Sequence, residues 1–412
     1  MRLDRRQVLG GLAATPFLTG MPRSAFAQNA SLNYWHHFTS TTEFKGLERV
    51  MAAFKQKNPG IAVTQENIPN PEYMSKMTAA VVANSKPDTC MVVAERASDL
   101  VAMGALVDLS DRIKKWSRYA EYPAQAWAGS TVGGKIYGIP AFTFVDWMYY
   151  RKDWFAEKGI APPKTMAEFQ EAALKVTDPS KNRFGFSLRG GAGGFKYVID
   201  MIEAWGSPIV VDGKMAIDKK KATEAVAWYA ELLTKHKVVP ASAPNDSYRQ
   251  IMEAFKTGQT AMVWHHTGSL TEIQAALKPE QFGTLPMPAG PGGRSARLTY
   301  LFNGIANPAK VDAAMNWISY WAEPEPAIAF LEETGYFPSS PKVASDERIQ
   351  KNPLYAAAVE TTTFGKLPPT FVGVAGWSET VVLPEFQKVL VGRQTAEQAV
   401  DAMMKGLEAA LR

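Results

Sequence analysis

The stretch from residue 133 to residue 154 constrains the fold of this chain more than any other part. It opens with Gly133-Gly134, which predicts a tight turn into a β-hairpin strand, and Pro140 is expected to end that strand. Residues 141 to 150 follow as an apolar and aromatic run, long enough for a strand that is buried on both faces. The pattern then turns helical and ends at Gly159. A buried strand that starts from a proline-broken one is expected where a chain crosses between two domains.

The length of 412 residues also favours two domains, because a single hydrophobic core stops growing at about 250–300 residues. Hydrophobic residues make up 46% of the chain and charged residues 21%, which is ordinary for a soluble globular protein. Aromatic residues reach 11%, with 11 tryptophans. They indicate either two well-filled cores or a cleft in which aromatic rings stack on sugars.

The net charge of +5 overstates how basic the working protein is. Residues 1–27 carry four arginines against one aspartate, which leaves only +2 on the rest of the chain. Such a small excess argues against a nucleic-acid partner and against an anionic membrane surface.

The first residues are typical of a targeting segment. An Arg5-Arg6 pair precedes an apolar run that is too short to span a bilayer, and Ala25 and Ala27 fit a signal-peptidase site. We expect cleavage near Ala27 and export by the twin-arginine route, with the general secretion route and a cytosolic protein as alternatives. Cys90 is the only cysteine, so the chain has neither an intrachain disulfide nor a lipoprotein anchor. Together these features predict a free periplasmic protein without a membrane insertion.

The start of the remaining chain alternates strands and helices, which predicts a mostly parallel α/β sheet. Strands are expected at residues 31–35, 61–66 and 89–94, with helices between them. Ligands of such sheets lie beyond the C-terminal ends of the strands. The predicted rim residues are therefore His36, His37, Ser40, Thr41, Glu66, Asn67, Ala94 and Glu95.

Later segments repeat this arrangement. Strands are predicted at 184–188 and 260–264, the first followed by the glycine-rich loop 189–194, and a hairpin turn at Asp212-Gly213. The Gly/Pro-rich loop 289–293 indicates a second crossing between domains, ahead of a strand at 298–306, and residues 335–338 a third.

The order of these motifs resembles that of the extracellular solute-binding proteins of ABC importers, in their sugar-binding branch. The resemblance extends from about residue 31 to residue 412 and rests on the segments KPDTCMVV, GALVDLSD, GGKIYGIP, YYRKDWF, LRGGAGG, GQTAMVWHHTGSL, FGTLPMPAGPGG and TGYFPSS. It implies a type II periplasmic-binding-protein fold, with two α/β lobes, three crossover segments and a ligand cleft between the lobes. It also implies a monomer without cofactor or metal, which hands a sugar or polyol unchanged to permease subunits.

Within that family pattern, the lobes are expected to divide the chain as follows. Residues 28–141 and 297–337 form lobe I, and residues 142–296 and 338–412 form lobe II. The resemblance also places ligand contacts at matching positions of both lobes, with hydroxyl partners from polar groups and stacking from aromatic rings. These positions are Trp35, His36, His37, Ser40, Glu95, Asp146, Trp147, Arg189, Gly190, Gly191, Trp205, Trp264, His265, His266, Gly268, Tyr300, Asn303, Gly304, Tyr336 and Trp377.

Four of the five histidines lie in two Trp-His-His triplets, at residues 35–37 and 264–266, each at a predicted strand end. Because side chains alternate along a strand, about one histidine of each pair is expected to face the cleft. Three interpretations remain open: structural histidines, histidines that bind the ligand, and a zinc site assembled across the cleft.

The loop 189–194 has two interpretations, an anion-binding nest before a helix or a flexible turn. The anion-binding interpretation matters because parts of the sequence also resemble binders of glycerol 3-phosphate and glycerophosphodiesters. Those relatives carry an arginine in the C-terminal loop, whereas residues 371–377 have none. This departure favours a neutral sugar or polyol.

An exported hydrolase is the rival class of function. Glu95 and Asp146 are candidates for two carboxylates that face each other across a cleft. The chain has no HExxH, GxSxG or P-loop motif, however, so a binding protein is the favoured reading.

Overall fold

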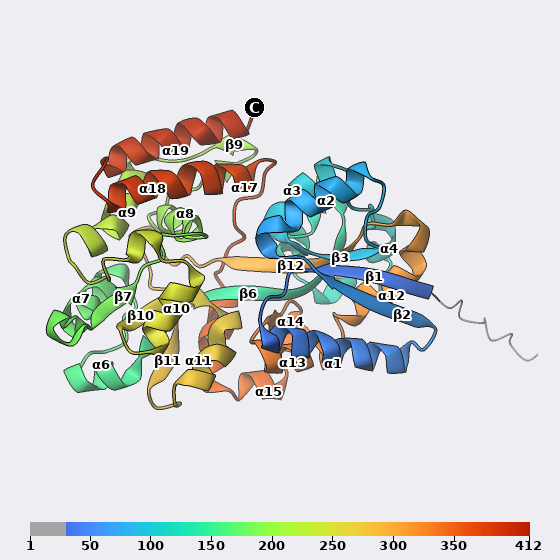
Figure 1. The fold of residues 1–412 in the computed structure, drawn as a ribbon, viewed down its shortest axis with the longest axis horizontal. Helices are drawn as coiled ribbons and strands as arrows, with labels where there is room; N and C mark the ends of the chain where they lie inside the picture. Colours follow the sequence, from blue (N-terminus) through green and yellow to red (C-terminus); the bar gives the residue numbers. More distant parts are fainter. Residues whose placement is uncertain (1–29) are drawn as a thin grey trace, which may run out of the picture.

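One long strand, β6 (Gly138–Arg151), runs through both halves of the molecule (Figure 1). In this computed structural model, which describes residues 30–412, its first half pairs with β12 (Leu298–Ile305) and its second half with β10 (Thr260–His266) and β11 (Phe282–Pro286). The expected signal peptide of residues 1–27 lies outside the described residues. The strand is buried along nearly its whole length, which confirms the buried run predicted from the sequence.

Pro140 does not end this strand, contrary to the sequence prediction. The register of β6 on β12 shifts at this point: Phe302 pairs with Pro140 and Leu301 with Phe142, so Ala141 is an extra residue. Such a β-bulge tolerates a proline, because the ladder is already interrupted there. The strand therefore continues without a break from one lobe into the other.

Lobe I is built on the sheet β2–β1–β3–β12–β6, in which β1 runs parallel to β2 and β3. Its helices cover the two faces of the sheet (Figure 1). The elements of this part are β1 (Ala30–His36), α1 (Thr41–Lys57), β2 (Ile61–Asn67), α2 (Tyr73–Val82), β3 (Thr89–Val93), α3 (Ala97–Ala102), α4 (Ser110–Lys114), α5 (Ala124–Ala128), β4 (Thr131–Val132), β5 (Lys135–Ile136), α12 (Val311–Tyr320), α13 (Pro324–Thr334) and β13 (Phe337–Pro338).

Lobe II is built on the second half of β6, with β11 on one side and β10 and β7 on the other. Strand β10 runs parallel to β7, so their C-terminal ends lie at the same edge. The predicted hairpin at Asp212-Gly213 is confirmed as β8–β9. The further elements are α6 (Lys152–Lys158), α7 (Met166–Val176), β7 (Phe184–Ser187), α8 (Phe195–Ala204), β8 (Val210–Val211), β9 (Lys214–Met215), α9 (Lys219–Thr234), α10 (Tyr248–Lys256) and α11 (Leu270–Ala276).

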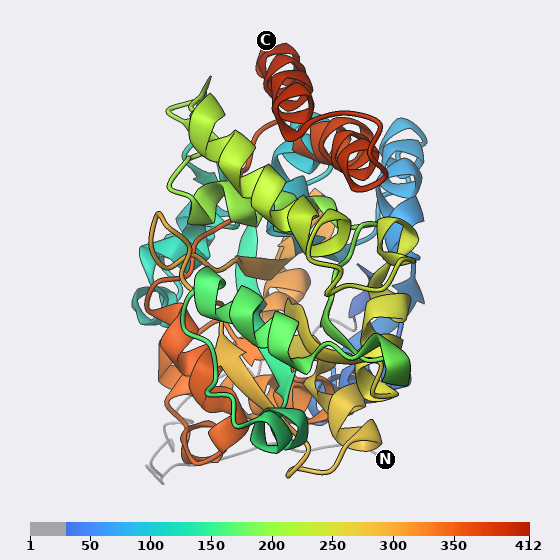
Figure 2. The same cartoon turned by 90° about the vertical axis from the view of Figure 1, so that its left-hand side faces the viewer.

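The C-terminal segment begins with short helices that follow the third crossing. After β13, helix α14 (Pro341–Ala344) packs against α13, and α16 (Ala356–Thr362) against β6 and β11, with α15 (Glu347–Gln350) between them. The chain then continues into α17 (Val374–Trp377), α18 (Leu383–Leu390) and α19 (Ala396–Ala410), and α18 and α19 cover α9 of lobe II (Figure 2). Helix α16 thus already packs on β11 of lobe II, and the lobe boundary expected at residue 338 stays a prediction.

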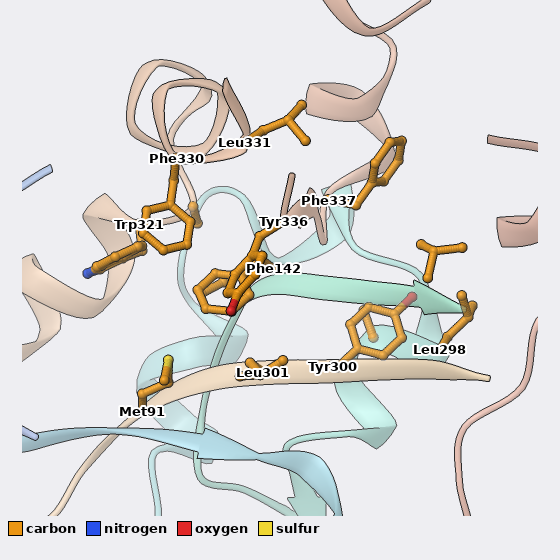
Figure 3. Close-up of a cluster of buried hydrophobic side chains, with 14 of the residues drawn as sticks. Met91, Phe142, Leu298, Tyr300, Leu301, Trp321, Phe330, Leu331, Tyr336 and Phe337 are labelled. Atoms are coloured by element: carbon orange, nitrogen blue, oxygen red, sulfur yellow. The ribbon is translucent and has the colours of Figure 1, made fainter. Parts of the chain in front are cut away.

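A cluster of aromatic side chains packs where the third crossing meets lobe I (Figure 3). The rings of Phe142, Phe330 and Tyr336 lie within 5.0–5.4 Å of one another, and Trp321 packs on Phe330 at 5.1 Å. Apolar burial of this size contributes about 25 cal/mol per Å² to the free energy of unfolding. It fixes Tyr336, whose hydroxyl reaches the seam between the lobes.

Candidate functional site

The C-terminal ends of parallel strands from both lobes meet at the seam between them. In lobe I, β1 ends at His36 and β3 leads into the turn Ala94–Arg96. In lobe II, β10 ends at His266 and β7 leads into the loop 189–194. Ligands of α/β proteins bind outside this edge of a sheet. Strands β1 and β3 thus end at the edge of the sheet that the sequence analysis expected, and the ligand contacts placed there stay a prediction.

A chain of buried ionic contacts runs across the seam. Arg297, in the second crossing, donates to Asp200 of α8 at 2.8 and 2.9 Å and to Glu95 of lobe I at 2.7 Å. Lys196 of α8 donates to Asp146 of β6 at 3.0 Å. Burial opposes the charge of Arg297, but Asp200 and Glu95 raise its pKa above the ordinary value. Because a buried charge without its partner costs several kcal/mol, this chain ties the two lobes together electrostatically.

An aromatic wall lies beside this chain. The ring of Phe144, on β6, stacks on His266 at 4.1 Å with an interplanar angle of 18°, and Tyr336 meets Phe144 edge-on at 4.6 Å. The Tyr336 hydroxyl hydrogen-bonds to Glu43 of α1. A side chain at Gly268 would place its Cβ 2.5 Å from the Tyr336 ring, so this position admits only glycine. Predicted residues His266, Gly268 and Tyr336 are therefore brought together, with Phe144 added to them.

His37 and Arg96 form the lobe I side of the seam. Both pack on the ring of Tyr73, His37 at 5.7 Å and the Arg96 guanidinium at 5.8 Å. Nδ1 of His37 and Nη1 of Arg96 are buried and have no hydrogen-bond partner. Burial, together with the charge of Arg96, lowers the pKa of His37 to about 3. A neutral imidazole beside an unpaired guanidinium N–H is an arrangement that a polar ligand atom satisfies.

His36 and His265 are satisfied within the protein. Nδ1 of His36 accepts the Phe38 N–H at 3.2 Å, so Nε2 carries the proton and donates to Gln65 at 2.7 Å. Nδ1 of His265 lies 2.7 Å from the Ser269 hydroxyl. Burial lowers the pKa of both rings, and nearby cationic groups lower that of His265 further. Both histidines are structural in this arrangement.

The glycine-rich loop 189–194 uses three of its N–H groups for hydrogen bonds inside the protein. The N–H groups of Gly190, Gly191 and Gly194 already donate to carbonyls of the protein, namely those of Ala243, Asp246 and Gly191. A Cβ on Gly190 or Gly191 would lie 2.5 Å from a backbone oxygen, so these glycines serve close packing. Arg189 projects from this loop, half-buried, with Nε donating to the Ala192 carbonyl at 2.7 Å.

Several predicted contacts are placed in the interior instead of the seam. Trp264 is 1% exposed and stacks on Tyr229, Trp147 is fully buried, and Trp377 donates to the Met403 carbonyl at 2.9 Å. Apolar strand and helix positions explain this outcome, since aromatic side chains dominate core packing. The other interior or structural positions are Trp35, Trp205, Tyr300, Asn303 and Gly304, while Ser40 is exposed and caps α1.

Sequence reasoning did not identify Arg96, Phe144, Lys196, Asp200 and Arg297. A signal existed for Phe144, because it lies two residues before Asp146 on the same predicted strand and so shares its face. None existed for Arg297 and Asp200, whose contact joins residues 97 positions apart.

Two further observations concern the part of the chain from residue 30 onward. It contains no cluster of three or more His, Cys, Asp or Glu side chains placed to hold a metal ion. Its helices also include none with the length and apolar character needed to cross a bilayer.

Comparison with known proteins shows the same fold and a family match. The sequence model of the family described as "Bacterial extracellular solute-binding protein" matches residues 39–328. A putative binding protein of Brucella abortus (strain 2308) is 23% identical over 420 residues, covering 97% of this chain and 99% of that protein. The tagatose-bound solute-binding protein of an ABC transporter from Thermotoga lettingae has a TM-score of 0.83 at 22% identity, over 93% of this chain and 100% of that one. Maltose-bound MalE3 of T. maritima also has a TM-score of 0.83, at 20% identity, over 92% and 99% of the two chains.

Proposed function

The chain belongs to the bacterial extracellular solute-binding protein family, and we propose that it captures a sugar or polyol between its lobes and delivers it unchanged to an ABC permease. The main support for this proposal is the set of side chains at the seam, where the two lobes face each other. Both lobes present polar and aromatic side chains there, and strand β6 continues from one lobe into the other. Such a geometry lets the lobes close on a ligand by a hinge motion.

The chemistry of the seam suits a polyhydroxylated ligand. Phe144 and Tyr336 offer aromatic faces for sugar C–H groups. Charged and imidazole groups offer donors and acceptors, and an unpaired buried polar group costs about 1–3 kcal/mol, which selects the ligand whose hydroxyls match. We assign the binding site to His37, Glu95, Arg96, Phe144, Asp146, Arg189, Lys196, His266, Gly268 and Tyr336. Tagatose and maltose, bound in the two structural relatives, support a carbohydrate as cargo.

The proposal includes the cellular setting. The exported form starts near residue 28 after twin-arginine export, works in the periplasm as a monomer, and contacts the permease subunits through the surfaces that border the seam. The Arg5-Arg6 pair and the Ala25/Ala27 positions support the export route.

The test is a thermal-shift and calorimetric screen of the processed protein against neutral sugars, polyols, sugar acids and glycerol 3-phosphate. At least one carbohydrate is expected to give saturable heat and a higher melting temperature, with the ligand recovered unaltered. A response confined to glycerol 3-phosphate would contradict the sugar assignment. Turnover of the bound compound, followed by chromatography, would contradict a binding protein and favour the hydrolase.

A further inference from the structure

Two arginines from opposite lobes border the seam without a carboxylate partner. Arg96 of lobe I and Arg189 of lobe II have no carboxylate oxygen within 4.0 Å among residues 30–412. Each donates a hydrogen bond to a backbone carbonyl, Arg96 to Asn70 at 3.2 Å and Arg189 to Ala192 at 2.7 Å, and Arg96 also packs on the Tyr73 ring. Burial lowers the pKa of both guanidinium groups, which reflects the cost of holding these charges away from water.

The carboxylates of the seam are already taken by other groups. Glu95 and Asp200 pair with Arg297, and Asp146 pairs with Lys196. Glu43 accepts from the Tyr336 hydroxyl and from the N–H groups of Thr39 and Ser40. Glu95 and Glu379 act on Arg96 only from a distance. Within residues 30–412, Arg297 and Lys196 thus each have a carboxylate partner, whereas Arg96 and Arg189 have none.

The surroundings of Arg96 point to a ligand atom. Its Nη1 is buried and unpartnered, and so is Nδ1 of His37, which packs on the same tyrosine ring. A guanidinium presents its N–H groups as a planar fork that matches a carboxylate, and a neutral imidazole beside it accepts or donates one further hydrogen bond.

Carboxylate fits the seam better than phosphate. Phosphate sites at helix N-termini use free backbone N–H groups, whereas the loop before α8 spends those of Gly190, Gly191 and Gly194 inside the protein. Arg189 is folded closely over this loop, since a Cβ on Gly193 would lie 2.3 Å from its Nη2. A planar guanidinium fork matches a planar carboxylate through two parallel hydrogen bonds.

We propose that the cargo is a sugar acid, a polyhydroxylated compound whose carboxylate pairs with Arg96 and whose hydroxyl groups bind His37 and Arg189. This inference rests on the proposed function and sharpens it. It replaces the neutral sugar expected from the loop 371–377, because the decisive arginines come from other segments of the chain.

The test is calorimetry on the processed protein with matched pairs: glucuronate and glucose, galacturonate and galactose, and oligogalacturonates with malto-oligosaccharides. In at least one pair the acid is expected to bind at least about tenfold more tightly than the neutral sugar. The ratio of the two affinities should fall as salt is added, because salt screens the charge on the carboxylate. A neutral member that binds as well as its acid would overturn the inference and leave the proposed function intact. Binding of neither kind, with or without a response to glycerol 3-phosphate, would overturn both.

Point variants test which arginine pairs with the carboxylate of the bound sugar acid. Arg96→Gln is expected to abolish the preference for the acid, because the guanidinium that pairs with the carboxylate is lost. Arg189→Gln is expected to weaken acid and neutral sugar alike. Arg112→Gln, which removes a surface arginine paired with Asp312, is the matched control and should change neither. An unchanged acid preference in Arg96→Gln, in protein with an unchanged melting temperature, would contradict the assignment.

Discussion

The same three residues, Trp-His-His, end one strand in each lobe, and the structure uses them differently. In both triplets the middle histidine is buried and hydrogen-bonded, His36 to Gln65 and His265 to Ser269. The last histidine borders the seam in both cases. Strand alternation accounts for this shared pattern, because neighbouring side chains point to opposite faces.

The difference lies in what surrounds each triplet. Trp35 is at the margin of a small core, with Nε1 on Glu66 at 2.8 Å and Lys76 over its ring, whereas Trp264 stands in the middle of the lobe II core. His37 keeps an unpaired nitrogen beside Arg96, while His266 accepts the Gly268 N–H at 3.1 Å and stacks on Phe144. Identical residues thus serve polar recognition in lobe I and an aromatic wall in lobe II.

The two triplets should differ most in how much their tryptophans contribute to the free energy of unfolding. Trp264→Ala removes a ring packed among Tyr229, Phe169 and Phe186, and should lower the free energy of unfolding by about 3–5 kcal/mol. Trp35→Ala should cost at least about 1 kcal/mol less, because its ring borders a polar pair and the smaller core. Urea denaturation followed by circular dichroism measures both. Equal losses would mean that the two tryptophans hold equivalent positions.

The tryptophans also show where sequence reasoning ends. The order of strands, the buried run of β6 that contains Asp146 and the strand end before Glu95 follow from local patterns of apolar residues, glycine and proline. Local patterns do not show which of these side chains lie in the core and which border the seam. Trp264 and His266, for example, share a strand face and differ only in what packs over them. Partners such as Arg297 and Asp200 depend on how α8 meets the second crossing, and no local pattern records that contact.

The second difference between the triplets lies in how their histidines make the stability of the fold depend on pH. The folded-state pKa values of His36, His37 and His265 lie below the unfolded value. Their contribution to the free energy of unfolding is therefore complete above about pH 6.5, the unfolded pKa of histidine. It is lost as the pH falls toward about 3, the pKa of His37 in the folded protein. Each buried neutral histidine makes unfolding easier by up to about 1.4 kcal/mol per pH unit in that window. Cationic neighbours act on His265, whereas Gln65 and Glu43 oppose the shift at His36.

His265→Asn should therefore remove more of the pH dependence than His36→Asn, in denaturation curves recorded between about pH 7 and pH 4. His236→Asn, at the fifth histidine, which lies beside Glu231 on the surface of lobe II, is the control. A steeper dependence on His36 than on His265 would show that the lobe I histidine is the more strongly desolvated one.

The smallest difference should appear in ligand binding. His37→Ala removes the imidazole beside Arg96 and should weaken binding of the cargo about tenfold, or roughly 1.4 kcal/mol, without a change in melting temperature. His266→Ala should weaken binding less, because Phe144 and Tyr336 keep the aromatic wall in place. Titration calorimetry compares the two variants, with His236→Ala as control. A larger loss at His266 would reverse the roles assigned to the two triplets.

The central claim is that the cargo sits between the lobes and closes them, and small-angle scattering with and without saturating ligand tests it most directly. The account predicts a smaller radius of gyration in the bound state, because a hinge motion about β6 and the other crossings brings the lobes together. A radius of gyration that stays the same while calorimetry shows the ligand bound would contradict it.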